Sequence, residues 1–196
     1  MNTIYDFETM SQDPVNGVVV SFAMLNFDPK RFTTNPYTYH ELVDNAKFMK
    51  FDVVDQVMNY GRTICKETVA WWGKQSKEAQ AAIAPNAAVD RPISELYSFY
   101  KENMPDYPRL TYTRRNTFDP VFMTSLMKAT GNSEPYAWWD VRDTISYIEG
   151  LAITGDIKNN FVPDDLVEHF VAHDPRHDIA MDVMRLQILV DAVTSF

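Results

Sequence analysis

Apolar and polar residues along the first 45 positions form a pattern that predicts strands. Three stretches rich in apolar and β-branched residues cover residues 3–5, 18–27 and 37–43. The Asn16-Gly17 pair between the first two is typical of a tight turn between antiparallel strands. This part of the chain therefore predicts an antiparallel meander of three strands.

Further along the chain, apolar residues recur mainly with the spacing of helices. The expected helices cover residues 66–84, 92–103, 116–131, 144–154 and 175–193, and two short strands cover 110–113 and 138–141. Asn116, Asp143 and Asp174 are expected to cap three of these helices, and Gly155 to close one of them. Strands followed by alternating helices and strands predict an α/β fold, with a central mixed sheet and helices on both faces.

Length and composition indicate one globular domain spanning residues 1–196. Hydrophobic residues make up 45% of the chain and aromatic residues 13%, which is enough for a full core. The single cysteine, Cys65, excludes an internal disulfide and fits a reducing compartment. With no apolar run long enough for a membrane span and no signal-peptide pattern, we expect a cytoplasmic protein without a membrane partner.

The net charge of −9 argues against a protein that coats nucleic acid through a broad basic surface. The charge does not exclude an enzyme that binds one strand end at a metal-containing site. Arg109, Arg114 and Arg115 lie shortly before an acidic segment, where they are either phosphate contacts or ordinary surface residues.

Acidic residues in three separate segments are the candidate chemistry of this chain. Asp6 and Glu8 lie one residue apart on a predicted strand, so their carboxylates point to the same face. Asp119 follows a predicted strand, and Asp178 lies in the first turns of the last helix. Four carboxylates that converge at one edge of a sheet would repel one another without cations, which makes metal binding their natural use.

The same segments resemble the motifs of the DEDDh (DnaQ-like) 3′–5′ exonucleases, which have the RNase H-like fold. The matching residues are Asp6-Phe7-Glu8, Asn116-Thr117-Phe118-Asp119 and a His/Asp segment near the C-terminus. Within that family, residues 6–10, 67–85 and 170–182 are similar to the phage DexA-type exonucleases and their RNase T-like relatives. The resemblance implies two Mg²⁺ or Mn²⁺ ions bound by the four carboxylates and a histidine that acts as general base.

The third motif can be aligned in more than one way. A histidine precedes an aspartate by five residues in the pairs His169/Asp174, His173/Asp178 and His177/Asp182. Asp174 precedes a proline and is expected to cap the helix. His173 lies just before the helix, where it is free to reach an attacking water, whereas His177 lies inside it. We therefore favour His173 and Asp178, and keep His177 and Asp182 as the alternative.

Residues near these motifs are candidates for substrate binding. The resemblance implies that Phe7, Thr9 and Met10 line the pocket of the terminal nucleotide, with Asn116 as a further candidate. Phe118 or Phe122 would stack on a base, although core packing is the more ordinary role of such rings. For the pairs Trp71-Trp72 and Trp138-Trp139 we expect one core residue and one half-buried neighbour.

The function predicted from these residues is hydrolysis of single-stranded DNA from its 3′ end to nucleoside 5′-monophosphates. Trimming of RNA 3′ ends is the alternative, because RNase T-like relatives act on RNA. A non-catalytic nucleic-acid-binding module is a third hypothesis, which predicts the loss of a carboxylate or of the histidine. A phage-encoded protein would act in the host cytoplasm, and because relatives include dimers, a homodimer is an open alternative to a monomer.

Overall fold

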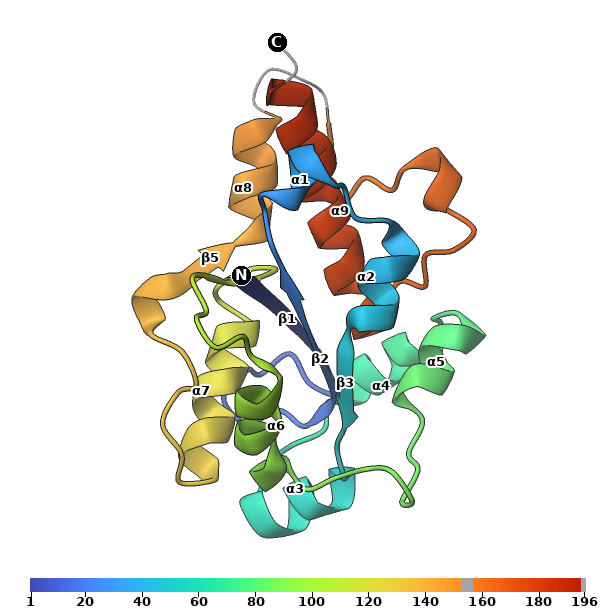
Figure 1. Ribbon diagram of the computed structural model, residues 1–196. Helices are drawn as coiled ribbons and strands as arrows, with labels where there is room; N and C mark the ends of the chain where they lie inside the picture. Colours follow the sequence, from blue (N-terminus) through green and yellow to red (C-terminus); the bar gives the residue numbers. More distant parts are fainter. Residues whose placement is uncertain (153–156, 195–196) are drawn as a thin grey trace.

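The computed structural model describes residues 1–152 and 157–194, which are built around a five-stranded sheet (Figure 1). The strands are β1 Asn2–Thr9, β2 Val19–Phe27, β3 Lys47–Lys50, β4 Thr111–Thr113 and β5 Val141–Asp143. They lie in the order β3-β2-β1-β4-β5. The β1–β2 and β2–β3 pairs are antiparallel, and the β1–β4 and β4–β5 pairs are parallel. The prediction of a mixed sheet is confirmed.

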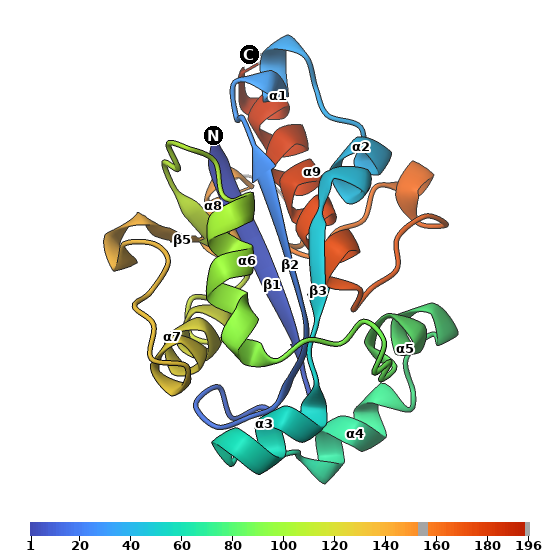
Figure 2. The ribbon, with the colours of Figure 1, turned by 60° about the horizontal axis from the view of Figure 1, so that its bottom comes forward.

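Helices cover both faces of this sheet, as predicted. They are α1 Arg31–Thr34, α2 Tyr39–Asn45, α3 Val53–Tyr60, α4 Lys66–Trp72, α5 Lys77–Ile83, α6 Leu96–Asn103, α7 Asp119–Ala129, α8 Thr144–Leu151 and α9 Pro175–Thr194, with 3-10 turns η1 Ile93–Glu95, η2 Trp138–Asp140 and η3 Asp164–Leu166. One buried cluster joins α1, α2, α8 and α9 to the sheet, and a second joins α6 and α7 to it. Figures 1 and 2 show these two groups of helices on opposite sides of β1 and β2.

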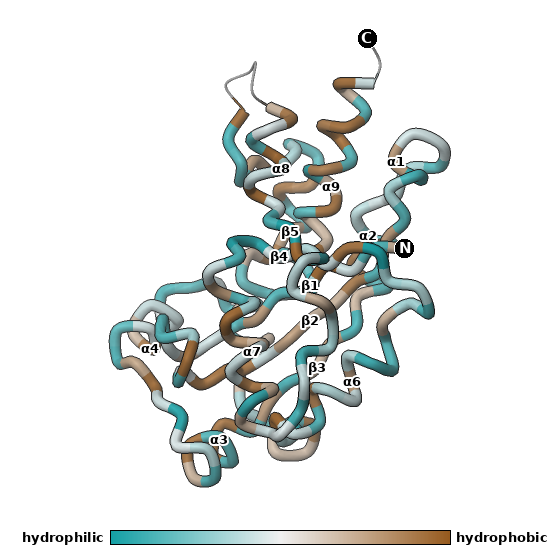
Figure 3. The backbone as a smooth tube through the Cα atoms, turned by 90° about the vertical axis from the view of Figure 1, so that its left-hand side faces the viewer, coloured by the Kyte–Doolittle hydropathy of each residue, from teal (hydrophilic) through white to brown (hydrophobic). Residues whose placement is uncertain are grey.

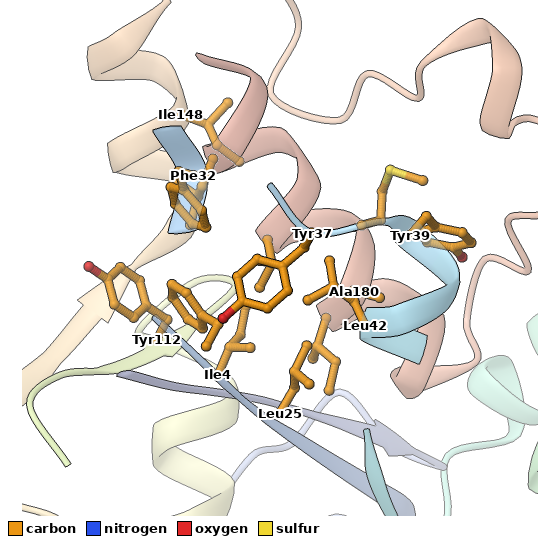
Figure 4. Close-up of a cluster of buried hydrophobic side chains, with 14 of the residues drawn as sticks. Ile4, Leu25, Phe32, Tyr37, Tyr39, Leu42, Tyr112, Ile148 and Ala180 are labelled. Atoms are coloured by element: carbon orange, nitrogen blue, oxygen red, sulfur yellow. The ribbon is translucent and has the colours of Figure 1, made fainter. Parts of the chain in front are cut away.

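The alternation of side chains along β1 decides which way the acidic pair points. Ile4 belongs to the cluster under α9, which Figure 4 shows with Leu25 and Ala180. Tyr5 and Phe7 belong to the cluster on the opposite face. Because neighbouring residues of a strand point to opposite faces, the side chains of residues 6 and 8 lie on the side of α9.

The long helix α9 begins where the sequence predicted. Asp174 precedes it and Pro175 is its first residue, and the Asp174 carboxylate accepts a hydrogen bond from the Arg176 N–H (3.1 Å). Brown and teal segments alternate along α8 and α9 in Figure 3, as expected for helices that bury one side. Within residues 1–152 and 157–194, no helix combines the length and apolar character needed to cross a bilayer.

The strand predicted over residues 37–43 is wrong, because this segment leads into helix α2. The Thr38 hydroxyl accepts a hydrogen bond from the Glu41 N–H (3.2 Å), which caps the helix. Tyr39 and Leu42, three positions apart, are buried together. The third strand of the meander is β3, directly after this helix. A short apolar run can be read with the two-residue period of a strand or the 3.6-residue period of a helix until the helix cap is recognised.

Other element boundaries also differ from the prediction. Residues 66–84 form two helices, since the Ser76 hydroxyl caps α5 by accepting from the Ala79 N–H (3.1 Å). Helix α3 was not predicted, and residues 138–140 form η2 ahead of β5. Helix α8 is capped by Asp143 as predicted, whereas Thr154 and the closing Gly155 lie outside the described residues.

The Asn16-Gly17 pair lies in a longer loop and does not form the predicted two-residue turn between β1 and β2. The Gly17 N–H donates to the Asp13 carbonyl (2.8 Å). A Cβ atom at Gly17 would lie 2.5 Å from that oxygen, so only glycine fits here. The loop follows the acidic pair directly and carries Gln12 to the pocket described below.

Candidate active site

A free edge of β1 lets helix α7 approach the acidic pair. β4 pairs with β1 only at Thr3 and Ile4, so the N–H of Phe7 is left for another partner. It donates to the Asp119 carboxylate (3.2 Å), which stands at the first position of α7. The prediction that Asn116 caps this helix is wrong, because α7 starts at Asp119 and the Asn116 side chain accepts a hydrogen bond from Thr113 (3.2 Å).

The segment before α9 brings a histidine to the same place. His173 has φ 67°, a left-handed conformation that is uncommon for a residue with a side chain. Its N–H donates to the Asp178 carboxylate (2.9 Å). One ligand atom each of Glu8, His173 and Asp178 lies within 4.8 Å of the other two. Residues from the first strand and the last helix therefore form one cluster.

All five residues predicted to carry out catalysis line a single pocket of about 590 Å³. These residues are Asp6, Glu8, Asp119, His173 and Asp178. A second pocket of about 760 Å³ adjoins the first one, since Phe7, Glu8, Gln12 and Phe118 line both. The far wall of the second pocket is α4 with the turn that follows it, where Glu67, Ala70 and Trp71 of the helix and Lys74 after it line the pocket.

Burial and mutual repulsion disfavour the charged forms of the four carboxylates. Burial raises the pKa of Asp119 to about 8 and that of Asp178 to about 7. Burial followed by the negative charge of Asp119 raises the pKa of Asp6 well above its usual range, and burial followed by that of Asp178 does the same for Glu8. Such a set of oxygen ligands fits a divalent cation, which would stabilise the charged forms.

Two tryptophans of α4 hold the ring of His173. The His173 ring meets Trp71 edge-on at 4.7 Å between centroids and Trp72 at 6.1 Å. The Trp72 indole N–H is fixed by the Thr9 carbonyl (2.9 Å). Burial lowers the pKa of His173, so this imidazole is neutral near pH 7 and able to accept a proton.

The alternative pair, His177 and Asp182, has structural partners. His177 Nδ1 is hydrogen-bonded to the Tyr39 hydroxyl (2.7 Å) and also accepts from the Val171 N–H (3.4 Å). Asp182 is 2% exposed and pairs with Arg114 and Arg185, at 2.6 Å each. Neither His177 nor Asp182 lines the two pockets described above.

The structure places some of the residues predicted to bind substrate at a pocket and others away from it. Phe7, Thr9 and Phe118 line the larger pocket, whereas Met10 lines neither of the two pockets and its backbone groups bond to Val18 and Cys65 (2.8 Å each). Phe122 is 0% exposed, and a nucleobase therefore has no access to its ring.

Pocket residues that were missed or discounted come mainly from α4 and from the loop after β1. Trp72 is buried and Trp71 is 41% exposed, as expected for such a pair, but Trp71 also contacts His173. Gln12 lines both pockets, and no pattern in the sequence singled it out. The resemblance of residues 67–85 to the DexA-type exonucleases and the helical spacing of Glu67, Ala70 and Trp71 were the available signals for the α4 wall.

Comparisons with known proteins point to one kind of enzyme. The chain is 29% identical to the exodeoxyribonuclease of Enterobacteria phage T4, over 94% of this chain and 86% of that protein. It has the fold of E. coli exonuclease I, with a TM-score of 0.61 to its complex with a dT13 oligonucleotide and 0.60 to its zinc-bound complex with single-stranded DNA. The sequence identities to these two structures are 17% and 16%. The matched regions cover 99% and 100% of this chain but only 44% and 43% of the two exonuclease I chains.

These structural neighbours confirm the predicted RNase H-like exonuclease fold. The family of Rv2179c-like 3′–5′ exoribonuclease domains matches residues 1–181, which is most of the sequence. This match, the phage relative and the convergence of the acidic residues agree with one another. The chain therefore belongs to the Rv2179c-like 3′–5′ exoribonuclease domain family and is a 3′–5′ exonuclease.

Proposed function

We propose that this exonuclease degrades single-stranded DNA from the 3′ end by two-metal catalysis and releases nucleoside 5′-monophosphates. The observation that carries the proposal is the gathering of four carboxylates and one histidine in a single pocket. The carboxylates come from β1, α7 and α9, far apart in the sequence, and their raised pKa values mark a cluster suited to cations. A non-catalytic module would have no need to keep this set of residues.

Asp6, Glu8, Asp119 and Asp178 would hold two divalent cations, Mg²⁺ or Mn²⁺. Carboxylate oxygens are the hard ligands that these ions prefer. When bound, the cations would offset the negative charge of the scissile phosphate and stabilise the leaving oxygen. The Phe7 N–H and the His173 N–H orient Asp119 and Asp178 for this role.

His173 is the proposed general base. Its neutral ring accepts a proton from the attacking water, whose oxygen then forms a bond to the terminal phosphorus. The bond between that phosphorus and the 3′ oxygen of the preceding nucleotide breaks, and this oxygen takes a proton from solvent, which leaves a shortened strand with a 3′-hydroxyl and a free nucleoside 5′-monophosphate. Trp71 and Trp72 keep the imidazole at the pocket while this transfer occurs.

The larger pocket is the proposed site of the terminal nucleotide. It has a volume of about 760 Å³, adjoins the carboxylates and is lined by Phe118, Trp71 and Thr9. The Phe118 and Trp71 rings offer apolar faces to a base or a sugar without reading a sequence. Such a pocket suits an enzyme that removes any nucleotide from an end.

The choice of DNA is supported by the phage relative, which is an exodeoxyribonuclease similar over 86% of its length. RNA is the second candidate, because the matching family is described as exoribonucleases. That residues 1–196 form a single catalytic domain, acting in the cytoplasm of a host cell, belongs to the same proposal.

The direct test is degradation of matched single-stranded DNA and RNA, each labelled at the 5′ end, with Mg²⁺ or Mn²⁺. We expect a ladder that shortens from the 3′ end, faster on DNA than on RNA, and no products with EDTA. Asp6→Ala serves as the matched inactive control and should bind less metal. A faster rate on RNA would show that RNA, and not DNA, is the preferred substrate. Activity in Asp6→Ala would contradict the assigned metal site.

A further inference from the structure

Two neighbouring tryptophans lie exposed on the surface, where the sequence predicted that one would be buried. Trp138 is 74% exposed and Trp139 is 62% exposed, and their rings meet edge-on at 5.5 Å. Both belong to η2, directly before β5, and Figure 1 shows this orange segment beside α7. Exposed rings of this size forgo the stabilisation that burial would provide, so a ligand that covers them is a natural explanation.

A continuous stretch of chain connects this pair to the catalytic pocket. Arg115 and Thr117 line the pocket of the carboxylates, whereas Asn116 lines a smaller cavity of about 230 Å³ together with Trp138. Residues 115–117 therefore form the rim between the two. A strand with its 3′ end at the carboxylates would cross this rim to reach the tryptophans.

The rim is held in an unusual backbone conformation. Arg115 has φ 71°, and its N–H donates to the Asp143 carboxylate (2.9 Å) at the end of β5. In the described part of the chain, Arg115 and His173 are the residues other than glycine with positive φ, and both line the catalytic pocket. Backbone strain of this kind concentrates at functional sites.

The Arg115 side chain is a cation available to a ligand. Its neighbour Arg114 is engaged with Asp182 (2.6 Å) and with the side chain of Asn159 (3.1 Å). Arg115 is exposed, and its guanidinium makes no ion pair or hydrogen bond to residues 1–152 or 157–194. In a protein of net charge −9, such a cation at the rim of an acidic pocket is suited to a phosphate group.

We infer that Trp138, Trp139 and Arg115 form an upstream site for the same nucleic-acid strand whose 3′ end lies in the catalytic pocket. The two indoles stack on bases that precede the scissile bond, and Arg115 contacts a phosphate between them and the carboxylates. This inference rests on the proposed function, because it takes the substrate to be a single strand. The continuity of the rim with the catalytic pocket favours the strand over other occupants.

The test is the dependence of kcat/KM on substrate length, measured on a dT dinucleotide and a dT dodecamer. The dinucleotide is too short to occupy the upstream site. We expect W138A/W139A to lower kcat/KM on the dodecamer about fivefold or more, with much less effect on the dinucleotide. Tyr107→Ala is the matched control, since Tyr107 is 89% exposed and precedes β4, at the opposite end of that strand from Arg115.

Arg115→Ala tests the phosphate contact separately. We expect weaker binding of the dodecamer and a slope of log affinity against log salt that is smaller by about 0.7, the value for one phosphate on a single strand. An unchanged slope would remove Arg115 from the site.

Other results of the length experiment would overturn the inference. Equal losses on both substrates would assign the tryptophans to the catalytic pocket or to folding. An unchanged dodecamer rate combined with a smaller particle mass in light scattering would identify an interface between copies of this chain. If the wild-type protein degraded neither substrate, the proposed function itself would fail.

Discussion

Two histidine–aspartate pairs, one helical turn apart at the start of α9, have opposite surroundings. His173 and Asp178 line the catalytic pocket, and Asp178 lies close to Glu8. His177 and Asp182 repeat the same spacing four residues later, but their polar atoms are occupied by Tyr39, Arg114, Arg185 and Thr144. The spacing of five residues is identical, so the partners supplied by distant segments decide the role of each pair.

The comparison teaches how charge is handled in the two places. Asp182 is neutralised by two arginines of the chain itself, which makes it a structural group. Asp178 has Glu8 and Asp119 as neighbours in the pocket, and Arg114 and Arg185 act on it only without direct ion pairs, so an external cation is the partner that would neutralise it. A pocket carboxylate that forms no ion pair within residues 1–152 and 157–194 is thus the better indication of a metal ligand.

The largest predicted contrast is between the two aspartates: replacing Asp178 should lower activity, whereas replacing Asp182 should lower stability. Asp178→Ala should lower kcat by about three orders of magnitude, because several kcal/mol of transition-state stabilisation would be lost, and leave urea stability equal or higher. Asp182→Ala should lower the free energy of unfolding by about 3 kcal/mol, since it leaves Arg185 buried and unpaired. Nuclease assays and urea titrations of both variants make the measurement. An active Asp178→Ala variant would reverse the assignment.

Replacing the two histidines should sharpen the same contrast with a smaller effect. His173→Ala should lower kcat by about 10²- to 10⁴-fold, with little change in metal affinity, because the proton acceptor is lost. His177→Ala should lower the free energy of unfolding by about 1 kcal/mol, through loss of the Tyr39 hydrogen bond, and reduce kcat less than tenfold. A greater loss of kcat in His177→Ala than in His173→Ala would show that the second pair is catalytic.

Features with a local cause were predictable from the sequence. The shared face of Asp6 and Glu8 follows from strand geometry, and the start of α9 follows from Asp174 and Pro175. The gathering of the five proposed catalytic residues followed from the family resemblance together with these local elements.

Features that depend on packing between distant segments were not predictable in this way. Two partners of Asp182 come from residues 114 and 144, in distant segments, and no spacing rule connects them to it, whereas Arg185 lies three positions further along the same helix. The exposure of Trp138 and Trp139 depends on how η2 is placed beside α7. The helix at residues 39–45 was missed because an apolar run this short does not fix its period until the Thr38 cap is recognised.

The smallest predicted effect is the pH dependence of stability in the metal-free protein, which isolates the pocket carboxylates. Burial raises the pKa of Asp119 to about 8 and of Asp178 to about 7, above the value of about 4 expected in the unfolded chain. The folded protein then binds more protons than the unfolded chain between about pH 4 and pH 8. Stability is therefore greatest at the acidic end of this range and is lost as pH rises through 7 and 8.

In EDTA, we expect the melting temperature to fall by a few degrees between pH 6 and pH 8, which corresponds to about 1 kcal/mol of stability or more. Differential scanning fluorimetry at constant ionic strength makes the measurement. Asp178→Asn should reduce this fall, because it removes one titrating carboxylate from the pocket, whereas Mg²⁺ should reduce it by stabilising the charged forms. Equal falls in the wild type and Asp178→Asn would show that the pocket carboxylates are not the source of the pH dependence. Because the substitution preserves shape while removing charge, it tests the electrostatic difference between the two pairs and not their packing.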